Sequence, residues 1–516
     1  MAAPAVIMPA IRLWRPRFSY YWMTAAGGSS LAWMFALIAG LQAPRTWTLG
    51  FWTSVGLSPI SPTIHLDGVS WSFAMAVTTL AVGAIFTEVS KAPHTDWSAW
   101  STGLAAATTA LLSVLSGNIL AITLSWAAMD VIESIAGFLR SDNNERTRAH
   151  SFSTGMRLTG IILLIWAGTA ARAAPNGLDL ASLDPRLSPI LLLTIVLRLG
   201  SVSFLAPELP TPASSRNAAV LTRLASAAAY LALLTRIGNA GSGAASAGGW
   251  LWAAALLGLG GSIYWVRAQD ELKNCSAWLM GSTALAAAAA LRGLEQACLA
   301  WGIATLLSGG VLFLYNARHR LLRPIVIAGF LGITALPLTP SWAGVQLYSP
   351  LKPPLALLLI GQSFLLIGYL RHSMLPGLES LNEAERWVWA IYPLGLAFLP
   401  FTQWIIYWWS GAFDRLFDFS LADWLSTWPA AAALLGATLF AGVYRLSSQI
   451  PYKLVWSDIG QIRITWAAMI PALIFDYLSR LVQVFSRILE GEGGLLWTFL
   501  FVALLVSLFL QFTYGP

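Results

Sequence analysis

The chain has 516 residues, of which 57% are hydrophobic and only 10% are charged. A soluble domain carries about 25% charged residues, so this composition excludes a water-soluble fold of this length. High apolar content excludes disorder, and the absence of a glycine triplet period excludes a collagen-like fold. Long unbroken apolar runs predict an all-α, polytopic transmembrane helical bundle and not a membrane β-barrel.

The net charge is +7, but the basic residues stand singly between apolar runs. That pattern suits loops facing anionic lipid and not a nucleic-acid surface, so the lipid bilayer is the expected partner. Only four of the basic residues are lysines: Lys91, Lys273, Lys352 and Lys453. Cys275 and Cys298 lack a CxxC partner, and no two histidines have ligand spacing, so we expect neither a metal nor a cofactor.

Crossing about 30 Å of hydrocarbon takes roughly 20 helical residues, and about 14–16 segments of this chain qualify. Candidate spans lie near 21–41, 69–89, 99–115, 117–138, 156–172, 187–206, 217–236, 249–267, 276–292, 297–316, 322–347, 354–371, 386–410, 428–446 and 495–512. An N-terminus inside the cell satisfies the positive-inside rule best. Before the last span, polar residues four and three apart predict an amphipathic helix over 472–490.

Two carboxylates lie inside the fourth candidate span. Asp130 and Glu133 are three residues apart and so share one face of a helix. Buried carboxylates in spans can carry protons, because burial favours the neutral form. The alternative is that both lie near the span end, solvated or paired with Arg140.

Arg198 lies late in the sixth candidate span and Arg223 in the seventh. Arginine stays charged, so it pairs, shapes the potential or reaches the interface, and it carries protons poorly. We take Asp130, Glu133, Arg198 and Arg223 as candidates for a proton or ion pathway, with structural ion pairs as the alternative. Arg157, which opens the fifth span, is predicted to be an interfacial anchor.

Prolines gather at two places in the chain. Helix-break candidates are Pro207, Pro210 and Pro212 after the sixth span, and Pro337 and Pro340 in the eleventh. Broken helices at matching places of two halves are typical of transporters, because freed backbone groups can line a polar cavity. The alternative is two loops and a kink.

Several segments together resemble the antiporter-like membrane subunits of respiratory complex I and of Mrp-type cation/proton antiporters. The matching segments are His65-Leu66-Asp67-Gly68-Val69-Ser70, Asn118 to Leu139, Pro210-Thr211-Pro212-Ala213-Ser214, Tyr230 to Arg236, Gln269-Asp270-Glu271-Leu272-Lys273 and Leu336 to Trp342. They run from about residue 60 to 345 and again from 470 to 512. The resemblance implies an N-terminal span and loop over 1–60, an antiporter-like core over 61–350, additional helices over 351–460, and an amphipathic helix with a final span over 461–516.

The family relays protons through a glutamate and a chain of lysines or histidines at mid-membrane, and this chain departs from that pattern. Ala127 occupies the glutamate position after Trp126, with Asp130 one turn further on. Of the four lysines only Lys273 matches a family position. Lysine is the residue whose pKa can move towards 7 in a dry site, so its loss weakens the expected relay.

The resemblance implies a divergent antiporter-like integral subunit of a complex I-like, hydrogenase-like or Mrp-like assembly in the inner or plasma membrane. Its expected role is translocation of protons or Na⁺ with other membrane subunits, or a scaffold that has lost relay residues. As an enzyme it is at most a non-catalytic subunit of an NADH:quinone oxidoreductase-like complex. A stand-alone secondary transporter is the alternative. A membrane enzyme using the Asp414, Asp418 and Asp423 loop is a third hypothesis.

Overall fold

The computed structural model describes residues 1–447 except 16, 17, 19, 49–60, 90–96, 140–143, 172–178, 181, 182, 204–215, 241–246, 269, 270, 318, 376–384 and 410–425, and structural statements below concern these residues. The helices are α1 Ala2–Trp14, α2 Tyr21–Gly40, α3 Gly68–Glu88, α4 Trp97–Val114, α5 Ile119–Leu139, α6 Asn144–Ala171, α7 Ser188–Ser203, α8 Arg216–Ala240, α9 Ala247–Arg267, α10 Glu271–Leu291, α11 Glu295–Leu314, α12 Arg323–Leu331, α13 Pro353–Ser373, α14 Val388–Tyr407 and α17 Trp428–Ser447.

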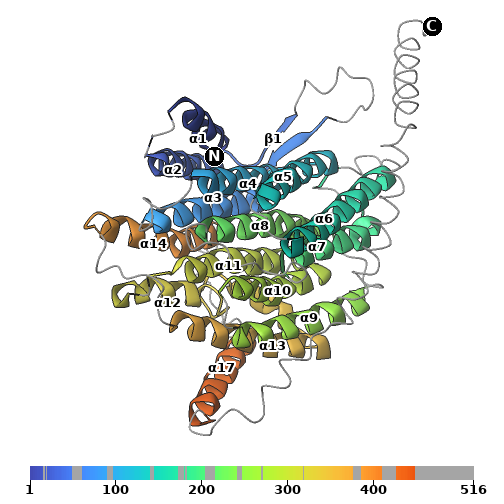
Figure 1. Cartoon of the computed structure of the whole chain (residues 1–516). Coiled ribbons are helices and arrows are strands. Elements are labelled where there is room, and N and C mark those ends of the chain that lie inside the picture. Colours follow the sequence, from blue (N-terminus) through green and yellow to red (C-terminus); the bar gives the residue numbers. More distant parts are fainter. Residues whose placement is uncertain are drawn as a thin grey trace, which may run out of the picture. The chain divides into compact units, whose positions relative to one another are not determined.

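The predicted all-α membrane bundle is confirmed. Nine of the described helices are long and apolar enough to cross a membrane, and the chain is a multi-pass membrane protein. Figure 1 shows the helices from α3 to α14 packed side by side. The amphipathic segment 472–490 and the final span near 495–512 lie outside the described residues, and the proposed division into four regions stays a prediction.

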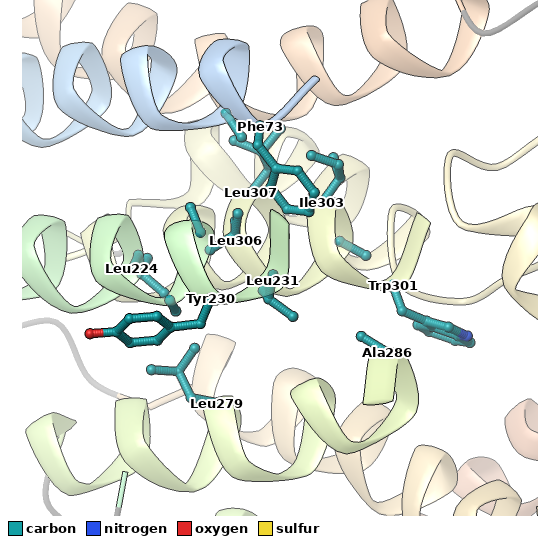
Figure 2. Close-up of a cluster of buried hydrophobic side chains, with 14 of the residues drawn as sticks. Phe73, Leu224, Tyr230, Leu231, Leu279, Ala286, Trp301, Ile303, Leu306 and Leu307 are labelled. Carbon is teal, nitrogen blue, oxygen red and sulfur yellow. The ribbon is translucent and has the colours of Figure 1, made fainter. Parts of the chain in front are cut away.

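Three helices form the middle of the bundle. Side chains of α3, α8 and α11 are almost wholly buried, because each of these helices is surrounded by others. Helix α3 packs against α2, α8 and α14, while α8 packs against α4 and α11. Apolar side chains from α3, α8, α10 and α11 meet in one cluster that includes Phe73, Leu231 and Trp301 (Figure 2).

One end of the bundle carries an element that the sequence pattern did not predict. Strands β1 (Arg45–Thr48) and β2 (Thr63–Leu66) pair antiparallel, with Arg45 opposite Leu66. The backbone of β2 also bonds to the α4–α5 connection, where His65 donates to Leu115 and Gly117 donates to Thr63. Backbone pairing between distant segments thus covers the helix ends on this side.

The start of α3 is tied to the end of α8 on the same side. Asp67 caps α3 by accepting from the Ser70 amide at 2.7 Å, and Arg236 donates to its carboxylate at 3.0 and 3.3 Å. Burial raises the pKa of Asp67, but the charge of Arg236 and hydrogen bonding by Ser70 outweigh it, and the pKa lies below the ordinary value.

At several contacts between helices, a tryptophan side chain packs directly against a glycine of the neighbouring segment. In each contact the indole nitrogen donates to a backbone carbonyl of the neighbouring segment, and a methyl group on the glycine would lie only 2.1–2.6 Å from the indole. The pairs are Trp71 on Gly40, Trp265 on Gly368, Trp278 on Gly309 and Trp301 on Gly344. Small residues allow close approach of helices in membranes, so these contacts set the helix spacing.

The eleventh candidate span is not one helix. Helix α12 ends at Leu331, and the chain resumes as a 3₁₀ helix at Trp342, with Pro337 and Pro340 in the segment between. The side chain of Gln403 from α14 covers the break: its amide nitrogen donates to the Gly332 carbonyl at 3.0 Å, and its oxygen accepts from Ser308. The Gly332 carbonyl, which the break leaves without a helical partner, is therefore met by a side chain of another helix.

The glycine contacts lead to a first prediction. Gly309→Ala places a methyl group against the indole of Trp278, and overpacking of this kind costs roughly 1–3 kcal/mol. Thermal unfolding of the purified protein should show the loss. Gly249→Ala is the matched control, because nothing lies within 4 Å of its added methyl group. Equal stability of the two variants would contradict the role of the glycine.

The depressed pKa of Asp67 leads to a second prediction. Its stabilising effect is present above the ordinary carboxyl value of 3.8 and is lost as the pH falls through the lower folded value. Asp67→Asn retains a capping oxygen but removes the charge. We expect it to lower stability at neutral pH by about 1 kcal/mol or less, since the pair is partly exposed. The difference in the free energy of unfolding between the variant and the wild type should disappear below about pH 4. Unfolding measured at several pH values tests this.

Candidate functional site

The carboxylates singled out in the sequence lie on α5, in the part of the bundle built from α4 to α8. Trp126, Asp130 and Glu133 follow one another at spacings of four and three residues, which places them on one side of the helix. Helix α5 packs against α4 and α6, and α7 packs against α6 and α8. The side chains on this side of α5 meet residues from α4, α6, α7 and α8.

Asp130 forms a buried ion pair with Arg198 of α7. One guanidinium nitrogen, Nη2, lies 2.5 Å from both carboxylate oxygens. The Arg198 side chain is 0% exposed and that of Asp130 5%. Charges removed from water to this degree persist only when paired, so each residue depends on the other.

Aromatic rings enclose the guanidinium of Arg198. Its central carbon lies 4.5 Å from the ring centre of Trp126 and 5.3 Å from that of Tyr230. Trp126 is itself fixed by a 2.7 Å hydrogen bond from its indole nitrogen to Ser113. Gly160 of α6 leaves room for the arginine stem, since a methyl group there would lie 2.9 Å from the Arg198 Cγ. Cation–π contacts add to the ion pair in this dry setting.

A second ion pair lies beside the first. Glu133 accepts from Arg157 of α6 through one oxygen and from the Ser226 hydroxyl of α8 through the other, at 2.5 Å in the second case. The guanidinium of Arg157 also bonds to Ser153. Arg157 is 4% exposed, so its prediction as an interfacial anchor is wrong: the residue is drawn into the bundle by the carboxylate of Glu133.

Asp130 also reaches a groove on the outer side of the bundle. The groove lies between α5 and α6, has a volume of about 490 Å³ and is lined mainly by apolar side chains, among them Val131, Ile135 and Leu158. These three side chains are at least half exposed, so the groove opens laterally. Asp130 thus belongs to the lining of the groove, while both of its carboxylate oxygens are bonded to Arg198.

Of the other residues predicted from the sequence, some lie in the described part of the chain and others lie outside it. Arg223 lies on α8 three residues before Ser226 and is partly buried, outside the two ion pairs. Pro207, Pro210, Pro212 and the Asp414, Asp418 and Asp423 loop lie outside the described residues, as does Arg140. Arg157, Ser226 and Tyr230 were missed as partners, although the polar spacing of Arg223, Ser226 and Tyr230 along α8 could have indicated a shared face.

The second half of the bundle has a different interior. From α9 to α14, the described Asp, Glu, Lys and Arg residues all lie in the first or last turn of a helix or between helices. Its buried polar groups at mid-helix are neutral, as with Gln362, Gln403 and Thr305. His372 at the end of α13 is buried against Trp265, with its Nε2 2.9 Å from the Trp265 carbonyl. Within the described part of the chain, no three His, Cys, Asp or Glu side chains lie close enough together to bind a metal ion.

No family model and no curated protein matches this chain, but solved structures share its fold. A chain of the membrane-bound sulfane sulfur reductase, an archaeal respiratory membrane complex, matches with a TM-score of 0.62 at 14% identity, over 98% of this chain and 99% of that one. A chain of the Mrp complex from Dietzia sp. matches at 0.66 and 14%, over 100% of this chain and 62% of that one.

A chain of respiratory complex I from Thermus thermophilus with bound NADH matches with a TM-score of 0.58 at 17% identity, over 81% of this chain and 99% of that one. At such identities the likeness establishes the fold alone. The fold predicted from the sequence motifs is thereby confirmed, and the low identity fits a divergent chain.

The ion pair of Asp130 and Arg198 leads to a third prediction. Arg198→Gln should destabilise the protein by about 3–5 kcal/mol, because it leaves a buried carboxylate without its counter-charge. Combining it with Asp130→Asn should restore much of the loss, and unfolding measurements on all four proteins give the coupling. The matched control is Arg236→Gln. The side chain of its partner Asp67 is 25% exposed, so this variant should lose much less stability than Arg198→Gln. Additive losses would contradict a mutually dependent pair.

Proposed function

We propose that this protein is an antiporter-like membrane subunit of a larger assembly in the cell membrane, related to respiratory or Mrp-type complexes. The end-to-end match to a chain of a respiratory membrane complex, 98% of this chain against 99% of that one, supports a subunit of similar extent. The described helices present many exposed apolar side chains, as expected of surfaces that face lipid or other membrane subunits.

One observation decides which role we propose for the subunit. The ion pairs of Asp130 with Arg198 and of Glu133 with Arg157 join α5 to α7 and α6, whereas the described interior from α9 to α14 holds neutral side chains at mid-helix. A proton path across the whole membrane needs groups that exchange protons, or water, along its full length. We infer that Asp130 and Glu133 exchange protons within the first half only, and that the subunit is chiefly a scaffold.

The arginine partners support the same inference. Arg198 and Arg157 stay charged under all conditions in which proteins are folded, so they hold the carboxylates in place and do not pass protons on. A carboxylate can be neutralised only if its arginine partner gains another counter-charge or the pair opens. Both changes are costly in a buried site, so proton exchange at this cluster is expected to be slow or to depend on other subunits.

A fourth prediction follows for the native assembly. Purification of the tagged full-length chain from its own membranes in mild detergent should yield other membrane subunits in fixed proportion. The tag alone on an unrelated multi-pass protein of the same membrane is the control. Recovery of the chain by itself, monodisperse and folded, would count against a subunit.

The same preparation separates a scaffold from a stand-alone secondary transporter. In liposomes the isolated chain should move neither protons nor Na⁺ faster than liposomes without protein, and Asp130→Asn should change nothing. Flux that is lost in Asp130→Asn would instead identify a transporter, with Asp130 in its path. The folded state of both proteins is checked by thermal unfolding before reconstitution.

A further inference from the structure

Helix α1 lies on the outside of the bundle, beside α2 and α4 (Figure 1). Its 13 residues extend over roughly 20 Å, which is too short to cross about 30 Å of hydrocarbon. One side of the helix is buried against the bundle through Pro4, Ala5 and Met8. The opposite side, with Val6 and Ile7, is exposed. Helix α1 is therefore a partner of the bundle along one side only.

Specific contacts fix α1 in this position. Pro9 has no N–H group, so the carbonyl of Ala5 four residues earlier lacks its helical donor. The Ser101 hydroxyl of α4 donates to that carbonyl at 2.7 Å. On the α2 side, Pro4 packs on Gly28, where an added methyl group would lie 2.4 Å from the proline Cγ. The direction in which the last turn of α1 projects is thus set by the fold.

The last turn of α1 exposes apolar and basic side chains together. Leu13 is 87% exposed and Trp14 83%, the highest values among the large hydrophobic residues that the structure describes. Arg12 and Arg15 stand on either side of them and are exposed as well. The guanidinium carbon of Arg15 lies 5.7 Å from the ring centre of Trp14. Apolar bodies beside charged heads suit the boundary between acyl chains and head groups.

Aromatic rings mark the same level on the neighbouring helices. Phe18 packs edge to face on Tyr21 at the start of α2, with ring centroids 5.2 Å apart. Tyr21 lies 6.5 Å from Trp97, the first residue of α4, and Trp22 stacks on Trp387 at 5.3 Å just before α14. Tyrosine and tryptophan gather at the level of the lipid head groups. The end of the bundle where α2, α4 and α14 begin therefore lies at a membrane interface.

This end of the bundle is also the more basic one. It includes the end of α11 and the start of α12, because the Asn316 amide donates to Tyr392 of α14 and Tyr369 of α13 donates to the Val326 carbonyl. Its exposed basic residues are Arg12, Arg15, Arg267, Arg320, Arg323 and Arg386. The exposed basic residues described at the opposite end are Arg45, Arg186 and Lys352. Asp179 is exposed at that opposite end too, which lowers its positive charge further.

We propose that the last turn of α1, Arg12 to Arg15, binds the head groups of anionic phospholipids in the leaflet at this end. The two guanidinium groups donate to lipid phosphate, and Leu13 and Trp14 enter the acyl boundary beside them. The first acidic residue of the chain is Asp67, which caps α3 at the opposite end and pairs with Arg236. The charge of this turn is thus complementary to an anionic surface.

A second place at the same level favours lipid over a protein partner. At the start of α12, Arg320 and Arg323 flank Leu321, which is 72% exposed. Two separate turns, distant in the sequence, thus combine an exposed apolar side chain with flanking arginines at one interface. A leaflet of anionic lipid contacts both turns at once, whereas two protein partners would each need their own acidic surface. Lipid binding does not depend on the role proposed for the subunit.

A label at position 13 tests the binding directly. Leu13→Cys introduces an exposed thiol, and Cys275 and Cys298 are buried, so a polarity-sensitive fluorophore reacts at position 13. The labelled full-length protein is titrated in neutral detergent with phosphatidylglycerol, and the emission should shift to shorter wavelength. In the same background, Arg12→Gln with Arg15→Gln should raise the half-point about 30-fold, since each basic group at an anionic surface contributes about fivefold.

The matched control is Arg45→Gln with Arg186→Gln, which removes the same charge from the opposite end and should leave the half-point unchanged. Phosphatidylcholine and inorganic phosphate should each fail to shift the emission. An equal response to phosphatidylcholine, or an unchanged half-point in the Arg12 and Arg15 variant, would overturn the proposal. A shift with inorganic phosphate alone would overturn it as well, because it would indicate a site for a bare anion. Thermal unfolding shows beforehand that all variants are folded.

Salt gives an independent readout. Raising the ionic strength from about 0.1 M to about 1 M shortens the Debye length from about 10 Å to about 3 Å. The half-point for phosphatidylglycerol should therefore rise in the protein with both arginines and change little in the Arg12 and Arg15 variant. A half-point that is independent of salt would mean that the turn enters the micelle through its apolar side chains alone, which contradicts binding of the head group.

Discussion

The buried pair of Asp130 and Arg198 is the constraint around which the first half of the bundle is built. Each charge is tolerable in the membrane interior only because the other is present, and both are cut off from water by Trp126 and Tyr230. The pair joins α5 to α7, while Glu133 and Arg157 join α5 to α6. These four charges thus hold three helices in a fixed rotational setting, because any rotation would leave a charge unpaired.

The helices from α5 to α8 and those from α9 to α14 differ in the kind of side-chain contact that joins them. Between α5 and α8, polar contacts are ionic and directional. Between α9 and α14, the described helices meet through indoles seated on glycines and through neutral amides such as Gln403. The chain thus has the fold of antiporter-like subunits, while its described mid-helix charges lie in the first half. The scarcity of lysine, visible in the sequence, fits that division because arginine serves to pair and not to relay.

Features that depend on residues close together in the sequence could be predicted, whereas those that depend on contacts between distant residues could not. The spans follow from local apolar content, so the helices from α2 to α14 lie close to the predicted segments, except that α12 covers only the start of the segment 322–347. Helix α1 was missed because its 13 residues are too few to cross a membrane, and β1–β2 because strand pairing brings distant residues together. Asp130 and Glu133 stand out as charges in apolar runs, but their partners depend on helix rotation, which a single sequence does not contain. For that reason Arg157 was assigned to the interface and Tyr230 was overlooked.

The indoles on glycines have a consequence for how the protein responds to its surroundings. Their contacts involve no group that titrates and no charge that salt can screen. The half that contains most of them should keep its packing over a wide range of pH and ionic strength. The other half also depends on the pair of Asp67 with Arg236, which ties the start of α3 to the end of α8. Because the pKa of Asp67 lies below its ordinary value, this tie weakens when acid protonates the carboxylate. Acid is therefore expected to loosen the α3–α8 end before it affects the contacts of indoles on glycines.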